Sequence, residues 1–312
     1  MRLLSKTVFR VYLALALFLT GQSVIASTQY KFATIEGNKL FYREAGDPQN
    51  PVILLLHGFP SSSHMFRDLI PELERNFHII APDYPGMGNS DAPSGASPLT
   101  FNAVAHSVEG LMERLNVKET IIYMQDFGRP VGMRLATWHP EWVKGLVIQN
   151  SPVSLDGWNP DRLKAIESFA GPETPEKRAS AEARVVLATD VFLYQKGAQH
   201  PESLSPDAWI SDAYALNDPA KRKAMTDLQL DIVSNLQLYP VWQVYLKSIQ
   251  PRSLVIWGDN DPIFLPKGAD AVKEFVPLAH VHHYNTGHFA LEEEHQNIGE
   301  RINEFFSKPT LQ

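Results

Sequence analysis

The chain has 312 residues, of which 44% are hydrophobic and 20% charged, with a formal net charge of −7 and no cysteine. This length allows one large domain, or one domain carrying an inserted subdomain, with a sizeable core. The acidic balance argues against a nucleic-acid partner, because no basic stripe is available to neutralise phosphates. The lack of cysteine excludes disulfides, a cysteine nucleophile and thiolate metal ligands.

The N-terminus has the three parts of a secretory signal. Three basic residues precede or border the apolar run VYLALALFLT at residues 11–20, and small or tolerable residues then lead to Ala26. A run of this length is too short to cross a bilayer, which needs ~20 residues in a helix. We therefore expect residues 1–26 to be a cleaved signal peptide and the mature protein to be exported, periplasmic or secreted, without stable membrane association. An uncleaved N-terminal anchor is the alternative.

From residue 27 onward, short apolar runs rich in β-branched residues alternate with helical patterns. Runs with little polar alternation predict strands that helices cover on both faces. Six runs predict strands: residues 51–56, 77–81, 120–124, 145–149, 253–257 and 280–284. Residues 30–35 and 39–43 predict an antiparallel hairpin at one edge, and residues 101–115 and 130–139 have helical spacing. The pattern predicts an α/β fold with an eight-stranded, mostly parallel sheet flanked by helices.

The alternation stops between residues 151 and 251. This stretch is rich in proline and aromatic residues and has helical patterns without a clear strand. Because strand–helix units return after Pro251, it predicts a helical cap inserted between two strands rather than a separate C-terminal domain. The expected organisation is a core of residues 27–150 and 252–312, with residues 151–251 as the cap.

The main chemical feature is Asp126, at the end of the predicted strand 120–124. The sequence Gln125-Asp126-Phe127-Gly128 runs from a strand into a helical pattern, which is the setting of a nucleophile elbow. Asp126 stands where the G-x-S-x-G form of that turn has its serine, and the serine motif occurs nowhere in the chain. Capping of the following helix is the alternative role for this aspartate.

Two later loops supply an acid and a histidine in the chain order that such a fold requires. Asp261, in the Gly-Asp-Asn-Asp-Pro turn after the predicted strand 253–257, is the preferred acid, and Asp259 is the alternative. His288 lies in a Thr-Gly-His turn after the last predicted strand. Together with Asp126 they predict a catalytic triad.

An earlier loop, His57-Gly58-Phe59-Pro60, directly follows the predicted strand 51–56. In a hydrolase with a nucleophile elbow, this loop gives one backbone N–H to the oxyanion hole, and the residue after the nucleophile gives the other. The two expected donors are the backbone N–H groups of Phe59 and Phe127.

With these motifs together, the sequence resembles the epoxide hydrolase and haloalkane dehalogenase branch of the α/β-hydrolase superfamily, over residues 30–306. The resemblance rests on an H-G-x-P loop, a Q-D-x-G elbow, a G-x-x-D turn and a late G-H pair. It implies that Asp126 attacks carbon to form an ester of the enzyme. His288, oriented by Asp261, would then activate the water that cleaves the ester. This chemistry requires no metal or organic cofactor.

The residues around Asp126 bear on the choice between an epoxide and a halide. Dehalogenases of this branch hold the halide with a Trp after the nucleophile and a second Trp or Asn, whereas Phe127 and Phe59 stand in those places and cannot donate from their side chains. Fluoroacetate-type dehalogenases have arginines one and four residues after the nucleophile. Arg129 is out of that register, and we expect it to be exposed or ion-paired. Epoxide hydrolases protonate the leaving oxygen with cap tyrosines, for which Tyr239 is the first candidate and Tyr194 the second.

The expected function is therefore hydrolysis of a small or medium apolar epoxide, with an apolar small molecule as the expected partner. Hydrolysis of carbon–halogen bonds and ester or lactone hydrolysis are the enzymatic alternatives. A catalytically idle binding protein with a hydrolase fold is the alternative from another class.

Overall fold

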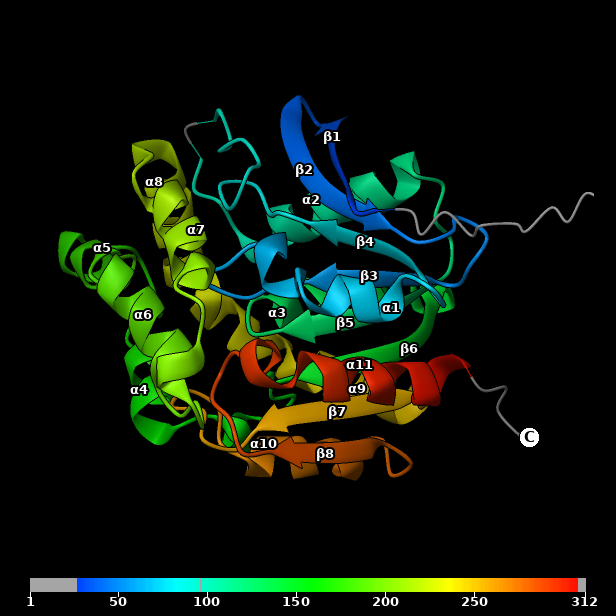
Figure 1. Ribbon diagram of the computed structural model, residues 1–312. Helices are drawn as coiled ribbons and strands as arrows, with labels where there is room; N and C mark the ends of the chain where they lie inside the picture. The colour runs from blue at the N-terminus through cyan, green and yellow to red at the C-terminus, as the bar shows by residue number, and fades with distance from the viewer. Residues whose placement is uncertain (1–26, 96, 308–312) are drawn as a thin grey trace, which may run out of the picture.

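The computed structural model describes residues 27–95 and 97–307, so the predicted signal peptide lies outside the described residues. The centre of the molecule is one eight-stranded sheet with the order β1-β2-β4-β3-β5-β6-β7-β8 (Figure 1). The strands are β1 (Gln29–Ile35), β2 (Asn38–Ala45), β3 (Val52–Leu56), β4 (His78–Pro82), β5 (Thr120–Gln125), β6 (Val143–Gln149), β7 (Ser253–Gly258) and β8 (His280–Tyr284). Only the β1–β2 and β2–β4 pairs are antiparallel in this sheet. The predicted mostly parallel sheet is confirmed.

Helices cover both faces of this sheet, which explains why its central strands are continuous apolar runs. Every residue of β4, β5 and β7 is buried. In Figure 1, α1 and α11 lie in front of the sheet, and α2, α3 and α9 lie behind it. The core helices are α1 (Leu69–Leu73), α2 (Phe101–Arg114), α3 (Gly128–Trp138), α9 (Tyr239–Ile249), α10 (Lys267–Asp270) and α11 (Leu291–Ser307). Helix α3 starts two residues before Pro130, because a proline in the first turn lacks only an N–H that the helix does not use.

The stretch between β6 and β7 forms helices and turns, with one isolated β-bridge between Trp158 and Phe264. Its first five helices are α4 (Pro160–Glu167), α5 (Pro175–Glu182), α6 (Leu187–Gln195), α7 (Asp207–Leu216) and α8 (Pro219–Asp231). They gather beside the carboxyl ends of the parallel strands in Figure 1. Helix α9 also belongs to this stretch, but it packs against the core helix α3. No helix within residues 27–95 and 97–307 is long and apolar enough to span a membrane.

Candidate active site

Asp126 occupies a tight turn between β5 and α3. Its backbone has a φ of +49°, in the left-handed region that residues other than glycine rarely adopt. Gly128 permits the turn, because a Cβ there would lie 2.2 Å from the backbone oxygen of Leu56. The sequence therefore forms the strained strand–turn–helix geometry of a nucleophile elbow, which exposes its central side chain at the end of the sheet.

Two backbone amides hold the Asp126 carboxylate. The N–H of Phe59 donates to Asp126 Oδ1 at 2.8 Å, and the N–H of Phe127 helps to lower the pKa of the same carboxylate. The loop approaches so closely that a Cβ on Gly58 would lie 2.6 Å from Asp126 Cβ. The structure thus brings the two predicted donors to one carboxylate, where hydrogen bonds to the charged form are strong.

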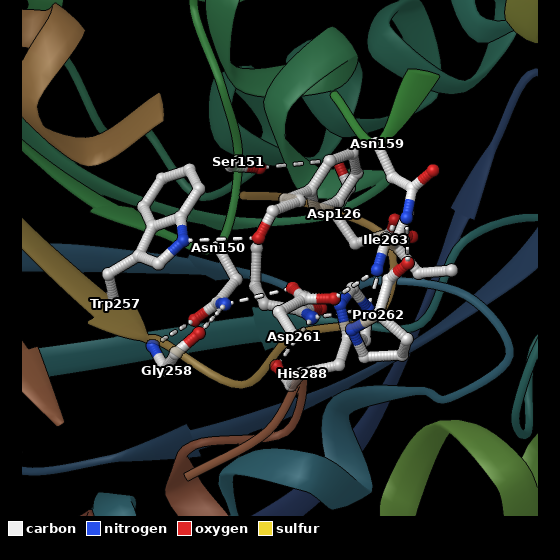
Figure 2. Close-up of polar contacts among 12 residues, drawn as sticks. Asp126, Asn150, Ser151, Asn159, Trp257, Gly258, Asp261, Pro262, Ile263 and His288 are labelled. Carbon is white, nitrogen blue, oxygen red and sulfur yellow. Dashed lines mark hydrogen bonds and ion pairs between the residues drawn. The ribbon is translucent and has the colours of Figure 1, made fainter. Parts of the chain in front are cut away.

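His288 and Asp261 form a buried pair next to Asp126 (Figure 2). His288 Nδ1 lies 2.8 Å from Asp261 Oδ2, and His288 Nε2 lies 3.9 Å from Asp126 Oδ2. Asp261 also accepts from Asn150 Nδ2 at 2.8 Å and from the N–H of Ile263 at 2.7 Å. A carboxylate with only donors around it requires a proton on His288 Nδ1, so the lone pair of that ring is on Nε2, the atom nearer Asp126.

The alternative acid, Asp259, lies elsewhere. Its Oδ1 is 2.6 Å from Nδ1 of His283, an exposed histidine on the edge strand β8. Of the two aspartates in this turn, only Asp261 contacts His288.

Electrostatics link Asp126 and His288. Burial raises the pKa of Asp126, while His288 and the amides of Phe59 and Phe127 oppose that rise. Burial alone would lower the pKa of His288, but the carboxylate of Asp261, and then that of Asp126, outweigh burial and raise it. The imidazole is therefore a stronger base than an isolated histidine.

Two polar residues that the sequence analysis did not single out complete these contacts. Gln125, the last residue of β5, places its Nε2 3.0 Å from His288 Nε2. Asn150 follows β6 with a φ of +40° and bonds to both Asp261 and the backbone of Gly258. In the sequence, the signal that could have identified both residues is their position as polar residues at the carboxyl end of a buried strand, where the ends of neighbouring parallel strands meet.

The side chain of Tyr239, the first tyrosine candidate, is buried. Its hydroxyl oxygen accepts from Trp158 Nε1 at 2.7 Å, and the guanidinium carbon of Arg129 lies 5.1 Å from the centre of its ring. Burial raises the pKa of Tyr239, and the nearby Arg129 opposes that rise. Tyr239 touches Trp158, which lines the cavity described below, but it does not line the cavity itself.

Tyr194, the second tyrosine candidate, binds a carboxyl group on α7. Its hydroxyl donates to Asp212 Oδ2 at 2.7 Å and lies 3.1 Å from Ser61 Oγ. Burial raises the pKa of Asp212 to about 7, and burial together with Asp212 raises that of neighbouring Asp190 to about 8. Tyr194 is therefore bonded to a buried acidic pair and does not line the cavity around Asp126.

The expectation that Arg129 is exposed or ion-paired is wrong. Its side chain is 2% exposed, and its Nη1 donates to the backbone oxygen of Pro152 at 2.9 Å. Four aromatic rings lie within 6 Å of its guanidinium: those of Trp158, Tyr239, Trp242 and Phe264. Because the first turn of α3 faces the inserted segment, cation–π contacts replace the carboxylate that we expected.

A cavity of about 540 Å³ lies between Asp126 and the inserted helices. Asp126, His288, Phe59 and Phe127 line its core side. The other lining residues are Trp158, Arg162, Ile166, Ala183, Arg184, Val186, Ala188, Thr189, Phe192, Leu193, Gln229, Ile232 and Ile263. Most of them are apolar, as in small-molecule sites generally. Among residues 27–95 and 97–307, no cluster of three or more histidine and acidic side chains could hold a metal ion.

Comparisons with known proteins agree with this fold. The model of the alpha/beta hydrolase fold family matches residues 51–295. An uncharacterized hydrolase of Saccharomyces cerevisiae is 37% identical over 92% of this chain and 99% of its own length. Epoxide hydrolase 2 of Caenorhabditis elegans is 23% identical over 79% of this chain and 70% of its own length. A haloalkane dehalogenase of Mycobacterium marinum is 26% identical over 85% of this chain and 87% of its own length. The chain is therefore a hydrolase of the α/β-hydrolase superfamily, in the branch that contains the epoxide hydrolases and haloalkane dehalogenases.

Proposed function

We propose that this hydrolase opens epoxides through a covalent ester on Asp126. The observation that carries the proposal is that the two oxygens of the Asp126 carboxylate have different neighbours. Oδ1 accepts the amide of Phe59, while Oδ2 faces His288 Nε2, whose other ring nitrogen is held by Asp261. This arrangement supports a nucleophilic oxygen, an oxyanion site and a general base around one carbon atom.

In the first step, Asp126 Oδ2 attacks an epoxide carbon. The carbon–oxygen bond of the ring breaks, its electron pair passes to the ring oxygen, and that oxygen takes a proton from a donor. The product of this step is a hydroxyalkyl ester of Asp126. The carboxylate loses its negative charge on alkylation, which suits a buried group whose pKa is raised by its surroundings.

In the second step, His288 Nε2 takes a proton from water, and the water oxygen attacks Cγ of Asp126. The gap of 3.9 Å between Nε2 and Oδ2 is too long for a direct hydrogen bond and is consistent with a water beside both groups. The negative charge of the tetrahedral intermediate falls on Oδ1, against the amides of Phe59 and Phe127. Collapse releases the diol, which receives the proton from His288, and leaves Asp126 as a carboxylic acid. Loss of that proton restores the carboxylate and replaces the proton that the donor gave in the first step.

Trapping of the ester tests this mechanism. In a His288→Ala variant, ester formation is expected to continue while hydrolysis stops, so intact-protein mass should rise by the mass of the epoxide. The matched Asp126→Asn variant is expected to gain no mass. If His288→Ala gains no adduct from an epoxide that the wild type converts to a diol, the covalent route is contradicted. If the wild type converts no epoxide or halide, both proposed reactions are contradicted.

Tyr239 is our candidate for the proton donor. It lies directly behind Trp158, which lines the cavity, and the charge of Asp126 acts on its pKa. Its hydroxyl oxygen accepts from Trp158, so its own proton is free of that bond. Tyr239→Phe is expected to slow ester formation from an epoxide roughly 10²–10⁴-fold, the usual contribution of general acid catalysis. Ester formation should be followed in single turnovers by intact mass. Tyr194→Phe is the matched control, and equal slowing by both variants would contradict the assignment.

Hydrolysis of an alkyl halide is the second candidate, since Trp158 lines the same cavity as Asp126. Its indole N–H donates to Tyr239, however, and is therefore not free for a halide. Halide release by the wild type, undiminished or increased in Tyr239→Phe, would favour this second function over epoxide opening.

A further inference from the structure

The cavity wall formed by the inserted helices carries two arginines. Arg162 lies on α4 and Arg184 follows the end of α5, and both line the cavity that contains Asp126. Of the described residues that line this cavity, only Asp126 is acidic. The wall opposite the candidate nucleophile is therefore positively charged.

Neither arginine has a carboxylate partner within residues 27–95 and 97–307. Arg184 lies over the ring of Phe169 at 4.8 Å, and Arg162 over the ring of Phe192 at 5.9 Å. No ion pair or side-chain hydrogen bond joins either guanidinium to a described residue. Because a ring covers only one face of a guanidinium, its N–H groups at the edge stay available.

The charge of Arg162 also acts on Arg184. Burial lowers the pKa of the half-buried Arg184, and the positive charge of Arg162 lowers it further, with no carboxylate opposing either effect. Arg184 is half-buried and Arg162 is exposed at the mouth of the same cavity. An anion between two like charges relieves their repulsion, and guanidinium groups bind carboxylates with strong, directional hydrogen bonds. An anionic group in this cavity would be repelled by Asp126 and attracted to the arginines.

We infer that the substrate is an apolar molecule that carries a carboxylate, which Arg184 and Arg162 bind while its reacting carbon lies at Asp126. This inference rests on the proposed function and refines its substrate from a wholly apolar epoxide to an amphiphilic one. The apolar part contacts side chains such as Ile166, Leu193 and Ile232, which line the same cavity. Arg184, being the more buried of the two, makes the larger contribution.

A pair of matched substrates tests the inference in turnover. One is an alkanoate with an epoxide at the far end of its chain, and the other is its neutral primary amide. In the wild type, the carboxylate is expected to have the lower KM. Arg184→Gln is expected to raise the KM for the carboxylate roughly ten- to hundredfold, the range of charge-assisted hydrogen bonds, with little change for the amide. Arg184→Lys, which keeps the positive charge, should restore part of the difference in KM between the carboxylate and the amide.

Binding without chemistry separates this inference from the proposed function. Decanoate and decanamide, which carry no epoxide, are titrated calorimetrically into the wild type, Arg184→Gln and Arg162→Gln. Arg222→Gln, an exposed arginine on α8, is the control with the same charge change. Decanoate should bind more tightly than decanamide, and only the two cavity variants should lose this preference. Equal binding of decanoate and decanamide, or an equal loss of the preference in Arg222→Gln, would overturn the anion site. If decanoate binds selectively but His288→Ala forms no ester with any epoxide, the anion site stands and only the proposed function is refuted.

Discussion

Replacement of Asp126 by asparagine is expected to lower epoxide turnover by on the order of 10⁴-fold or more, because the neutral amide is a poor nucleophile for carbon. Initial rates of diol formation by the purified variant measure this loss. Asp126→Ala gives a second variant without any residual acyl oxygen.

The same substitution is expected to leave the fold intact. Burial raises the pKa of Asp126, so its charged form is held at a cost in stability that a neutral asparagine avoids. Thermal unfolding of Asp126→Asn should therefore occur at the wild-type temperature or above. Asp259→Asn, which removes an aspartate that does not contact His288, is the matched control and should keep near-wild-type activity. Activity above about a tenth of the wild type in Asp126→Asn would contradict the nucleophile assignment.

Replacement of Asp261 by asparagine is expected to slow hydrolysis of the ester by on the order of 10⁴-fold, as when the acid of a serine-protease triad is replaced. The carboxylate fixes the His288 proton on Nδ1, and an amide cannot hold the same tautomer. The ester should then accumulate on Asp261→Asn in single-turnover experiments. Rapid hydrolysis in this variant, or an equal defect in Asp259→Asn, would contradict the role of Asp261.

The pH dependence of ester hydrolysis gives an independent readout of this contact. His288 acts as a base only when neutral, so hydrolysis should rise with pH through its raised pKa. Asp261 is the main group that offsets the lowering effect of burial on this pKa. Its replacement should therefore move the rising limb of the profile to lower pH while the maximum rate falls. If the rising part of the pH profile lies at the same pH in Asp261→Asn as in the wild type, a group other than His288 is titrating.

The sequence was sufficient for the sheet and for the order of the main site residues. Strands such as β5 and β7 are uninterrupted apolar runs, and each is followed by a loop that carries a charged side chain. Because the carboxyl ends of parallel strands lie along one edge of a sheet, residues as distant in sequence as Asp126, Asp261 and His288 were expected to meet, and the structure places them together.

Contacts that depend on packing between remote segments could not be predicted in this way. The aromatic cage of Arg129 takes its four rings from three stretches of chain between Trp158 and Phe264, and no local pattern signals their convergence. The bond of Tyr194 to Asp212 likewise joins two helices, α6 and α7, whose packing no local pattern specifies. The pairing of Asn150 with Asp261 follows from the register of β6 beside β7, which apolar runs alone do not specify.

The contacts of Asn150 have a consequence for how this protein can evolve. Asn150 stands where the chain leaves β6, and Gly258 and Asp261 stand where it has returned through β7. The Asn150 side chain bonds to the N–H and C=O of Gly258 and to Asp261, so the start of the inserted segment is fastened to the end of β7 and to the loop that carries Asp261. Insertions, deletions and charge changes among α4 to α8 can therefore accumulate without displacing the acid or the histidine. The helices that bound the cavity can therefore change in evolution, and with them the molecules that the cavity admits, while the residues around Asp126 keep their positions.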